Sequence, residues 1–183
     1  MSSSVPDGKG WIEDALRAAD AALYRAKREG RDRVVLALDN GIELVAGYLG
    51  AMRAGAVAVP LPPGPRSDRL PMAIEDCAPA ACVLDAATAA ALGARLAAVG
   101  RVFVLSQDGR SLLDALASAS PEPPDVELED GDLAAIIYTS GSTGEPRGVM
   151  LTHRNFVANA RSIVSYLGLT PADRVMCVLP FSY

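Results

Sequence analysis

The sequence predicts an α/β fold with a largely parallel sheet and flanking helices. From residue 34 onward, short apolar runs of strand length alternate with segments whose apolar residues recur at helical spacing. Half of the 183 residues are hydrophobic, which is enough to build a buried core. Because strands that alternate with helices favour parallel pairing, we expect right-handed crossovers between neighbouring strands.

The N-terminal region begins with residues 1–10, which are polar and are predicted to be disordered. They lack the apolar segment of a secretory signal, and no later apolar run is long enough to span a bilayer, so we expect a cytoplasmic protein. Residues Ile12 to Glu29 have helical apolar spacing, with basic residues in the last turn and Gly30 as the stop signal.

The next segment predicts a strand, a helix and a second strand, followed by a proline-rich loop that is stiff because each proline fixes φ. Asn40, with Glu43 three residues later, is expected to cap this helix, and Gly55 is expected to end it. The two strands are Val34 to Leu38 and Ala56 to Val59, the loop is Pro60 to Pro65, and the apolar helix face comprises Ile42, Val45, Leu49 and Met52.

Two further helix and strand pairs continue the alternation. The predicted elements are a helix from Asp68 to Cys77, a strand from Ala81 to Leu84, a helix from Thr88 to Val99 and a strand from Val102 to Leu105. Ser111 to Ala117 predicts one short helix. Ser118 to Asp132 is rich in proline and acidic residues with little that could pack, so it is predicted to be an exposed linker.

The stretch after the linker carries the chemistry. The apolar run from Leu133 to Tyr138 predicts a buried strand, and four hydroxyl side chains, three glycines and an arginine follow it closely. We expect Gly141, Gly144 and Gly148 to adopt positive φ and to bring backbone N–H groups close to an anion. The hydroxyls donate hydrogen bonds and Arg147 adds a charged fork, so the segment predicts a phosphate site.

Other motifs do not fit the spacing. A Walker A loop needs a lysine that this loop lacks, and a dinucleotide fingerprint needs a different glycine spacing. A lipase nucleophile elbow needs a glycine two residues before its serine, where Ser140 and Ser142 have Tyr138 and Ser140. An ordinary glycine- and serine-rich surface turn is the remaining alternative. Such a turn requires neither Arg147 nor the sequence Pro146-Arg147-Gly148 that follows the loop, so the phosphate site is the favoured interpretation.

The C-terminal part predicts a helix from His153 to about Tyr166, capped by Thr152, with Phe156, Ala160, Ile163 and Val164 on its apolar face. Its N-terminus is expected to point back at the loop, where free N–H groups would add to the anion site. His153 is interpreted as a neutral surface residue. A turn from Thr170 to Asp173 and a strand from Val175 to Leu179 follow.

Composition narrows the functional class. A net charge of −5 and the absence of a basic cluster with aromatic residues argue against nucleic acid as a partner. Cys77, Cys82 and Cys177 form an odd, scattered set, which is typical of reduced thiols in a core. With a single histidine there are too few ligands for a zinc site, so no metal site made of protein side chains is predicted.

The segment YTSGSTGEPRGVMLTHRN resembles the phosphate-loop signature of the adenylate-forming (AMP-binding) superfamily, which holds acyl-CoA synthetases, acyl-AMP ligases and peptide-synthetase adenylation domains. GIELVAGYLGAMRAGAVAVPLPP is similar to an early segment of the same enzymes. That family usually has lysine at Arg147, a change that keeps the charge and alters its geometry. The resemblance implies that ATP phosphates are bound by Thr139, Ser140, Gly141, Ser142, Thr143, Gly144 and Arg147.

The implied reaction is ATP-dependent activation of a small carboxylic acid to an acyl-adenylate, with release of pyrophosphate and transfer to a thiol. Mg²⁺ would accompany the ATP. The ending LPFSY looks more like acyl-CoA synthetases, which favours coenzyme A over a phosphopantetheine carrier, and it implies a candidate acid pocket at Phe181, Ser182 and Tyr183. No catalytic residue is assigned. The resemblance covers about Arg33 to Tyr183 and implies a partial domain, inactive alone, that lacks its C-terminal remainder.

A second resemblance lies upstream. Leu16 to Val34 resembles the closing helix and strand of GGDEF diguanylate cyclase domains. Residues 11–34 are interpreted as a segment from that family joined to the domain at 33–183, and the alternative is an alanine-rich helix that has converged on the same pattern. The GGDEF signature loop itself is not in the sequence. Two alternatives therefore stay open beside the ligase: a noncatalytic fragment or interaction module, and a signalling protein related to diguanylate cyclases.

Overall fold

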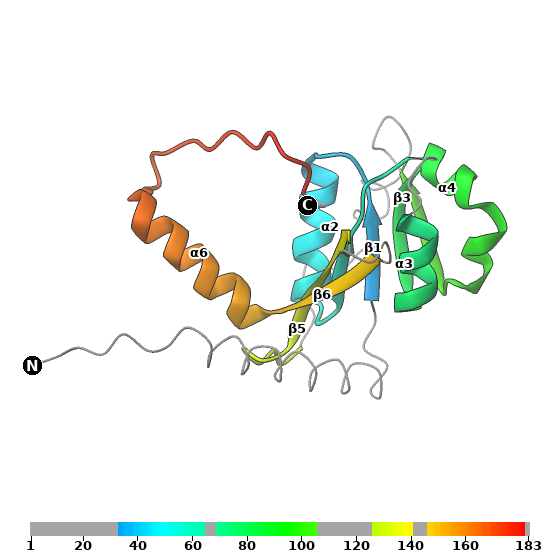
Figure 1. Cartoon of the computed structure of the whole chain (residues 1–183), viewed down its shortest axis with the longest axis horizontal. Coiled ribbons are helices and arrows are strands. Elements are labelled where there is room, and N and C mark those ends of the chain that lie inside the picture. The colour runs from blue at the N-terminus through cyan, green and yellow to red at the C-terminus, as the bar shows by residue number, and fades with distance from the viewer. Residues whose placement is uncertain (1–32, 65–68, 106–125, 141–145, 182–183) are drawn as a thin grey trace, which may run out of the picture.

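A computed structural model of the chain describes residues 33–64, 69–105, 126–140 and 146–181. Its centre is a six-stranded sheet with the order β4-β3-β1-β2-β5-β6 (Figure 1). All neighbouring strands are parallel except β5 and β6, which are antiparallel. The strands are β1 (Arg33–Ala37), β2 (Val57–Pro60), β3 (Ala81–Asp85), β4 (Arg101–Leu105), β5 (Leu133–Ser140) and β6 (Pro146–Thr152). The predicted fold class is therefore confirmed.

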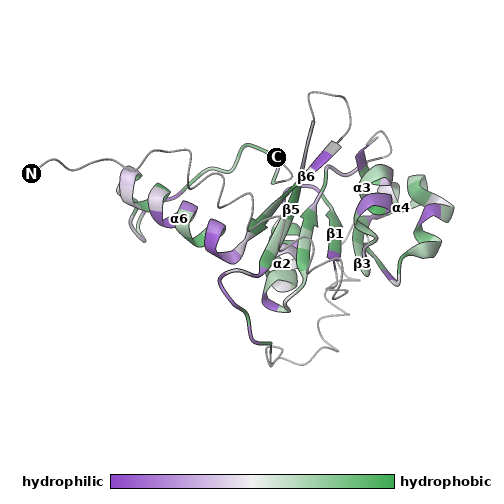
Figure 2. Ribbon diagram, turned by 60° about the horizontal axis from the view of Figure 1, so that its bottom comes forward, coloured by the Kyte–Doolittle hydropathy of each residue, from purple (hydrophilic) through white to green (hydrophobic). Residues whose placement is uncertain are grey.

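Helices cover both faces of the sheet. The described helices are α2 (Ile42–Arg53), α3 (Arg69–Cys77), α4 (Ala86–Leu92), the 3₁₀ helix η1 (Gly93–Ala98) and α6 (His153–Leu167). Alternate residues of β1 point to opposite faces, as the two-residue period of a strand requires. Val35 packs in one core cluster with Leu70 of α3, and Leu36 packs in the other with Leu44 of α2. In Figure 2 the central strands are hydrophobic along most of their length.

Helix α2 buries a different face from the predicted one. Leu44 and Ala51 are buried against the sheet, whereas Ile42 is 76% exposed and Leu49 is 59% exposed. The helix is apolar on more than one side, so spacing alone did not identify the buried stripe. Gly55 has φ of 74° directly after this helix, which confirms it as the stop.

The predicted helix from Thr88 to Val99 is divided. Helix α4 ends at Leu92, and Gly93 has φ of 49°, which an α-helix does not accommodate, so the chain continues as η1. The start of α4 is well fixed, because the Asp85 side chain accepts a hydrogen bond from the Thr88 N–H at 2.7 Å. The Thr88 hydroxyl also accepts from the Gly64 N–H at 2.7 Å, which ties the proline-rich loop to α4.

Strand β6 is an element that the sequence interpretation missed, and it changes the position of α6. The antiparallel register pairs Ser140 with Pro146 and Leu133 with Thr152. Helix α6 therefore begins beside the start of β5, not beside the predicted phosphate-binding segment at its end. Seven residues of strand separate the two, roughly 20 Å at 3.3 Å per residue. The expectation that the N-terminus of α6 contributes to the anion site is wrong.

The segment after α6 runs back toward α2 and does not form the predicted strand (Figure 1). Residues 173–178 have no regular secondary structure, since no described strand lies beside them to supply hydrogen-bond partners. The turn before this segment is confirmed: the Thr170 N–H donates to the Asp173 carboxylate at 2.6 Å, and the Asp173 N–H donates back to the Thr170 carbonyl at 3.0 Å.

Among the cysteines, Cys77 and Cys82 are buried in the core as expected, and Cys177 is exposed, so the core interpretation fails for Cys177. Burial raises the pKa of Cys77 to about 12 and that of Cys82 to about 11, which keeps both protonated. Within the described part of the chain, no helix combines the length and apolarity needed to cross a bilayer.

Several predicted elements lie outside the described residues. They are the disordered start at residues 1–10, the helix from Ile12 to Glu29, the helix from Ser111 to Ala117, the first part of the acidic linker and residues 141–145 of the loop. The described end of the linker, residues 126–131, is exposed as predicted. It is joined to the start of α6, because the Arg154 N–H donates to the Asp130 carbonyl at 2.9 Å.

Candidate functional site

The hairpin of β5 and β6 presents the predicted phosphate-binding segment at the carboxyl end of β5. Thr139 and Arg147 are directly opposite one another across the hairpin, and both are exposed. The Thr139 hydroxyl lies 3.5 Å from the Arg147 carbonyl oxygen, which accepts its hydrogen bond. Ser140 is the last residue of β5, and the remaining predicted residues, Gly141, Ser142, Thr143 and Gly144, lie outside the described ranges. The fold therefore places Thr139 and Arg147 opposite one another at the ends of β5 and β6 that flank this segment.

Gly148 does not have the role predicted for it. It lies within β6, opposite Tyr138, and its φ is not among the positive values in the described residues. A Cβ added there would be 2.7 Å from Cγ2 of Ile136 and 3.4 Å from Cζ of Tyr138. Gly148 is thus required because two core side chains of β5 lie against its backbone, not because the loop needs a left-handed residue.

Tyr138 fixes the strand that leads into the loop. Its ring is buried in the core between the sheet and α3, and its hydroxyl donates to the Asp76 carboxylate at 2.5 Å. Burial, together with this hydrogen bond, raises the pKa of Tyr138 well above the ordinary value of about 10. The tyrosine is therefore a neutral donor that ties β5 to α3, one residue before the first hydroxyl of the loop.

The single histidine is remote from the loop. His153 begins α6, and its backbone N–H donates to the Asp132 carbonyl at 3.0 Å, at the opposite end of the hairpin. Its side chain is half-buried, with Nε2 shielded from solvent and lacking a hydrogen-bond partner within the described residues, so it is less exposed than predicted. The capping of α6 is confirmed, since Thr152 accepts from the Asn155 N–H at 3.2 Å.

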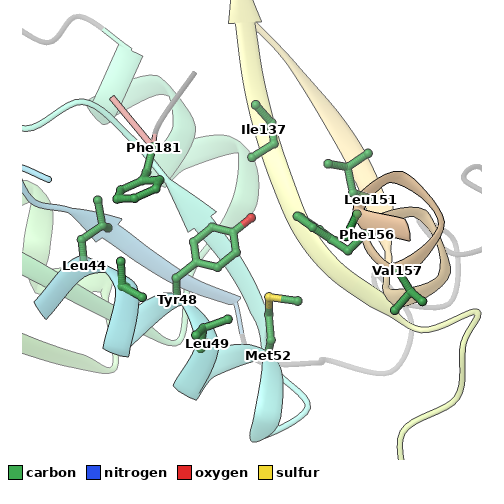
Figure 3. Close-up of a pocket in the computed structure, with 11 residues that line it drawn as sticks. Leu44, Tyr48, Leu49, Met52, Ile137, Leu151, Phe156, Val157 and Phe181 are labelled. Atoms are coloured by element: carbon green, nitrogen blue, oxygen red, sulfur yellow. The ribbon is translucent and has the colours of Figure 1, made fainter. Parts of the chain in front are cut away.

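A second candidate feature is a cavity of about 580 Å³ between α2 and α6, of a size typical of small-molecule sites. Figure 3 shows Phe181 beside Leu44 and Tyr48 at one side and Phe156 at the other. The rings of Tyr48 and Phe156 meet edge to face with centroids 6.2 Å apart. Its lining consists of Leu44, Val45, Tyr48, Leu49, Met52, Ile137, Leu151, Phe156, Val157, Ala160 and Phe181.

Phe181 is the one described residue of the predicted acid pocket, because Ser182 and Tyr183 lie outside the described ranges. It is 41% exposed and belongs to the cavity wall. Ile137, which also lines the cavity, lies two residues before Thr139 on β5. The cavity and the predicted phosphate-binding segment thus share one strand.

Asn40 is a residue of this region whose role the sequence interpretation assigned wrongly. The N-cap of α2 is Gly41, and its first turn has no side-chain cap. The Asn40 side chain instead donates from Nδ2 to the Leu179 carbonyl at 2.8 Å and accepts from the Phe181 N–H at 3.0 Å. No local signal could have revealed this contact, since the partners are 139 and 141 positions away in sequence.

The sheet is mostly parallel, a hydroxyl-rich segment follows the inner strand β5, and Arg147 of β6 lies opposite Thr139. This arrangement is typical of nucleotide-binding α/β domains, in which ligands lie outside the carboxyl ends of the strands. The sequence matches the AMP-binding enzyme family over residues 12–183. The chain therefore belongs to the AMP-binding enzyme family, as its loop sequence predicted.

The relatives include two kinds of enzyme. Bacitracin synthase 2 of Bacillus licheniformis is 32% identical over 167 residues, which cover 89% of this chain and 6% of that protein. Long-chain-fatty-acid–CoA ligase FadD13 of Mycobacterium tuberculosis is 31% identical over 168 residues, covering 91% of this chain and 33% of that protein. The crystal structure of ATP-bound MatB from Rhodopseudomonas palustris superposes with a TM-score of 0.75 at 36% identity, covering 91% of this chain and 34% of that one.

Two facts follow from these matches. The chain spans 6% and 33% of the lengths of the two curated relatives described above. The family match begins at residue 12 and so includes Leu16 to Val34, for which the comparisons give no support to a GGDEF relationship.

Proposed function

We propose that this chain acts as part of a longer cytoplasmic ligase that activates a carboxylic acid with ATP. In that reaction a carboxylate oxygen forms a bond to the α-phosphorus, the bond to the pyrophosphate oxygen breaks, and pyrophosphate leaves. A thiol then attacks the acyl carbon, and AMP is the leaving group. The observation that carries the proposal is the pairing of Thr139 and Arg147 at the mouth of the loop in a chain of the AMP-binding family.

The loop segment would hold the β and γ phosphates. Thr139, Ser140, Ser142 and Thr143 offer hydroxyl donors, and Gly141 and Gly144 allow their backbone N–H groups to approach an anion. Arg147 provides a permanent positive charge that forms charge-assisted hydrogen bonds. Mg²⁺, when it accompanies the ATP, would neutralise the charge that develops on the phosphates. These residues bind and orient the phosphates, while none of them transfers a proton.

The acid would lie at the cavity between α2 and α6. The walls are apolar apart from the Tyr48 hydroxyl, whose pKa is raised to about 12 by burial, so the cavity suits an acid with an apolar body. Phe181 supplies one wall, and Ser182 and Tyr183 follow it in the sequence as the other candidate residues. Placing the apolar body there leaves the carboxylate free to face the loop at the end of β5.

The test of the phosphate role is Arg147→Ala in the full-length ligase that carries this sequence. Charge-assisted hydrogen bonds contribute roughly 1.5–3 kcal/mol each, so the variant should slow adenylate formation by about one to three powers of ten. Arg147→Lys should be mild, because it restores the charge. The matched control is Arg154→Ala, since Arg154 is an exposed arginine at the other end of the hairpin. Acid-dependent exchange of pyrophosphate into ATP measures the effect.

The second half-reaction separates a phosphate role from general damage. Supplied with preformed acyl-adenylate, Arg147→Ala should transfer the acyl group at nearly the normal rate, because pyrophosphate is then absent. Equal loss in both half-reactions, or an unchanged rate of adenylation, would show that Arg147 does not bind the β and γ phosphates.

The thiol acceptor has two candidates. The LPFSY ending and the likeness to a fatty acid–CoA ligase favour coenzyme A. The likeness to bacitracin synthase 2 favours a phosphopantetheine carrier. Acyl transfer from the ligase to free coenzyme A and to a phosphopantetheine-loaded carrier domain, measured side by side, distinguishes the two; we expect coenzyme A to be the faster acceptor.

A further inference from the structure

Asn40 makes an unusual contact for a residue that follows a strand. It comes shortly after β1, at the carboxyl edge of the sheet, and both polar atoms of its amide are used by one short segment of the chain. The amide donates to the Leu179 carbonyl at 2.8 Å and accepts from the Phe181 N–H at 3.0 Å. In a parallel sheet, the backbone N–H and C=O of one residue make the same two hydrogen bonds to a neighbouring strand. Here the side-chain amide of Asn40 makes both.

Residues 179–181 have no regular strand neighbour among the described residues, and Leu179 itself is exposed. Pro180 lies between the two contacts and has no N–H, which leaves both contacts intact, because in a strand-like pairing the N–H of the intervening residue points to the opposite side. The Asn40 amide is therefore the described polar contact that holds this segment against the body of the domain.

The position of Asn40 is itself well determined. Leu38, two residues earlier, is buried in the core cluster beneath α2, and the Leu36 carbonyl accepts from the Leu61 N–H at 2.9 Å. On its other side, the Gly41 carbonyl accepts the hydrogen bond of the Val45 N–H that starts α2. Because β1 and α2 fix the backbone on both sides of Asn40, its hydrogen bonds fix the position of the segment that contains Phe181.

We infer that Asn40 is a positioning residue of the acid site: its amide holds Leu179 to Phe181 so that Phe181 closes the cavity between α2 and α6. The inference rests on the proposed function, in which the acid lies at this cavity. Removing the amide should let residues 179–181, and with them Phe181, move away from the acid site, while the predicted phosphate-binding segment stays unchanged. The expected signature is weaker binding of the acid with unaltered binding of ATP.

The contact is tested first in the 183-residue chain by hydrogen exchange at the Phe181 amide. Asn40→Ala should remove its protection. Asn40→Asp keeps an acceptor for the Phe181 N–H and loses the donor to Leu179, so protection at Phe181 should persist. Asn159→Ala, which removes an exposed amide from α6, is the matched control and should change nothing at Phe181. Equal exchange at Phe181 in the wild type and in Asn40→Ala would overturn the inference.

The functional arm uses the full-length ligase. A neutral hydrogen bond corresponds to roughly a two- to twelvefold change in an equilibrium constant, so Asn40→Ala should raise the KM for the acid by about tenfold and Asn40→Asp by about threefold. The KM for ATP should stay within about twofold in both. An equal rise in both KM values, or no rise for the acid, would contradict a positioning role at the acid site.

The two arms also separate this inference from the proposed function. If the wild-type ligase shows no acid-dependent pyrophosphate exchange, the proposed function fails and the role of Asn40 at an acid site fails with it, whatever the Phe181 amide shows. If exchange is normal and Asn40→Ala behaves as wild type, only the inference about Asn40 fails.

Discussion

The close approach between Gly148 and β5 can be tested by adding one methyl group. In Gly148→Ala the new Cβ would be 2.7 Å from Cγ2 of Ile136, well inside van der Waals contact. Ile136 is buried, and its β-branched side chain has little freedom at χ1, so it cannot turn aside without disturbing the core. Overpacking of this kind costs about 1–3 kcal/mol.

A glycine in a strand also loses more backbone entropy on folding than alanine does, by about 0.5–1 kcal/mol, and the substitution recovers that amount. The net loss should therefore be about 1–2 kcal/mol, which lowers the Tm by roughly 2–8 °C for a domain of this size. Thermal unfolding followed by circular dichroism on the purified chain measures it. The matched control is Gly50→Ala in α2, where an added Cβ meets no atom within 4 Å.

Gly50→Ala should raise the Tm by a few degrees, because alanine favours a helix over glycine by about 1 kcal/mol. If Gly148→Ala melts as high as Gly50→Ala does, Ile136 and Tyr138 do not lie against the β6 backbone, and our explanation of this glycine is wrong.

Three further predictions concern stability and reactivity. Tyr138→Phe removes the hydrogen bond to Asp76 and should lower the free energy of unfolding at pH 8 by about 0.5–1.5 kcal/mol in urea titrations. Because the pKa of Tyr138 is raised in the folded state, its contribution to the free energy of unfolding is complete below pH 10 and is lost as the pH rises above it. The difference in the free energy of unfolding between the wild type and Tyr138→Phe should therefore shrink in alkali. A difference that stays constant with pH would contradict the raised pKa. Asp85→Ala removes the cap of α4 and should cost about 1 kcal/mol, whereas Asp85→Asn, which keeps an acceptor, should cost less; equal losses would rule out capping as the cause. Iodoacetamide at pH 8 should modify Cys177 rapidly, because it is exposed, and Cys77 and Cys82 slowly, because burial shields them and raises their pKa. Mass spectrometry counts the adducts, and equal rates at all three cysteines would contradict the burial.

Local pattern was sufficient for the parallel part of the sheet. The strands β1, β3 and β4 are short apolar runs, and each was predicted to within about a residue at either end. The candidate phosphate-binding segment stands out because its hydroxyl and glycine residues are close together in sequence. The family follows from that same contiguous segment, which explains why a single sequence sufficed for it.

The errors arose where a residue's role depends on a distant partner. Strand β6 exists because the chain turns back on β5, and its residues have no alternating pattern of their own. Helix α2 is apolar on two sides, so its buried face is chosen by the sheet beneath it. Asn40 is of a residue type that commonly caps helices, yet its hydrogen-bond partners lie near the other end of the sequence.

The strand order has a consequence for how the chain folds. The four strands β4-β3-β1-β2 come from residues 33–105 and pair through short crossovers, whereas β5 must find β2 across the whole intervening sequence. Closing such a long loop costs entropy before any contact is gained, so the pairing of β5 with β2 should form late. The hairpin of β5 and β6 would then be assembled on a scaffold that already exists, and its amides should be the last in the sheet to gain protection during refolding.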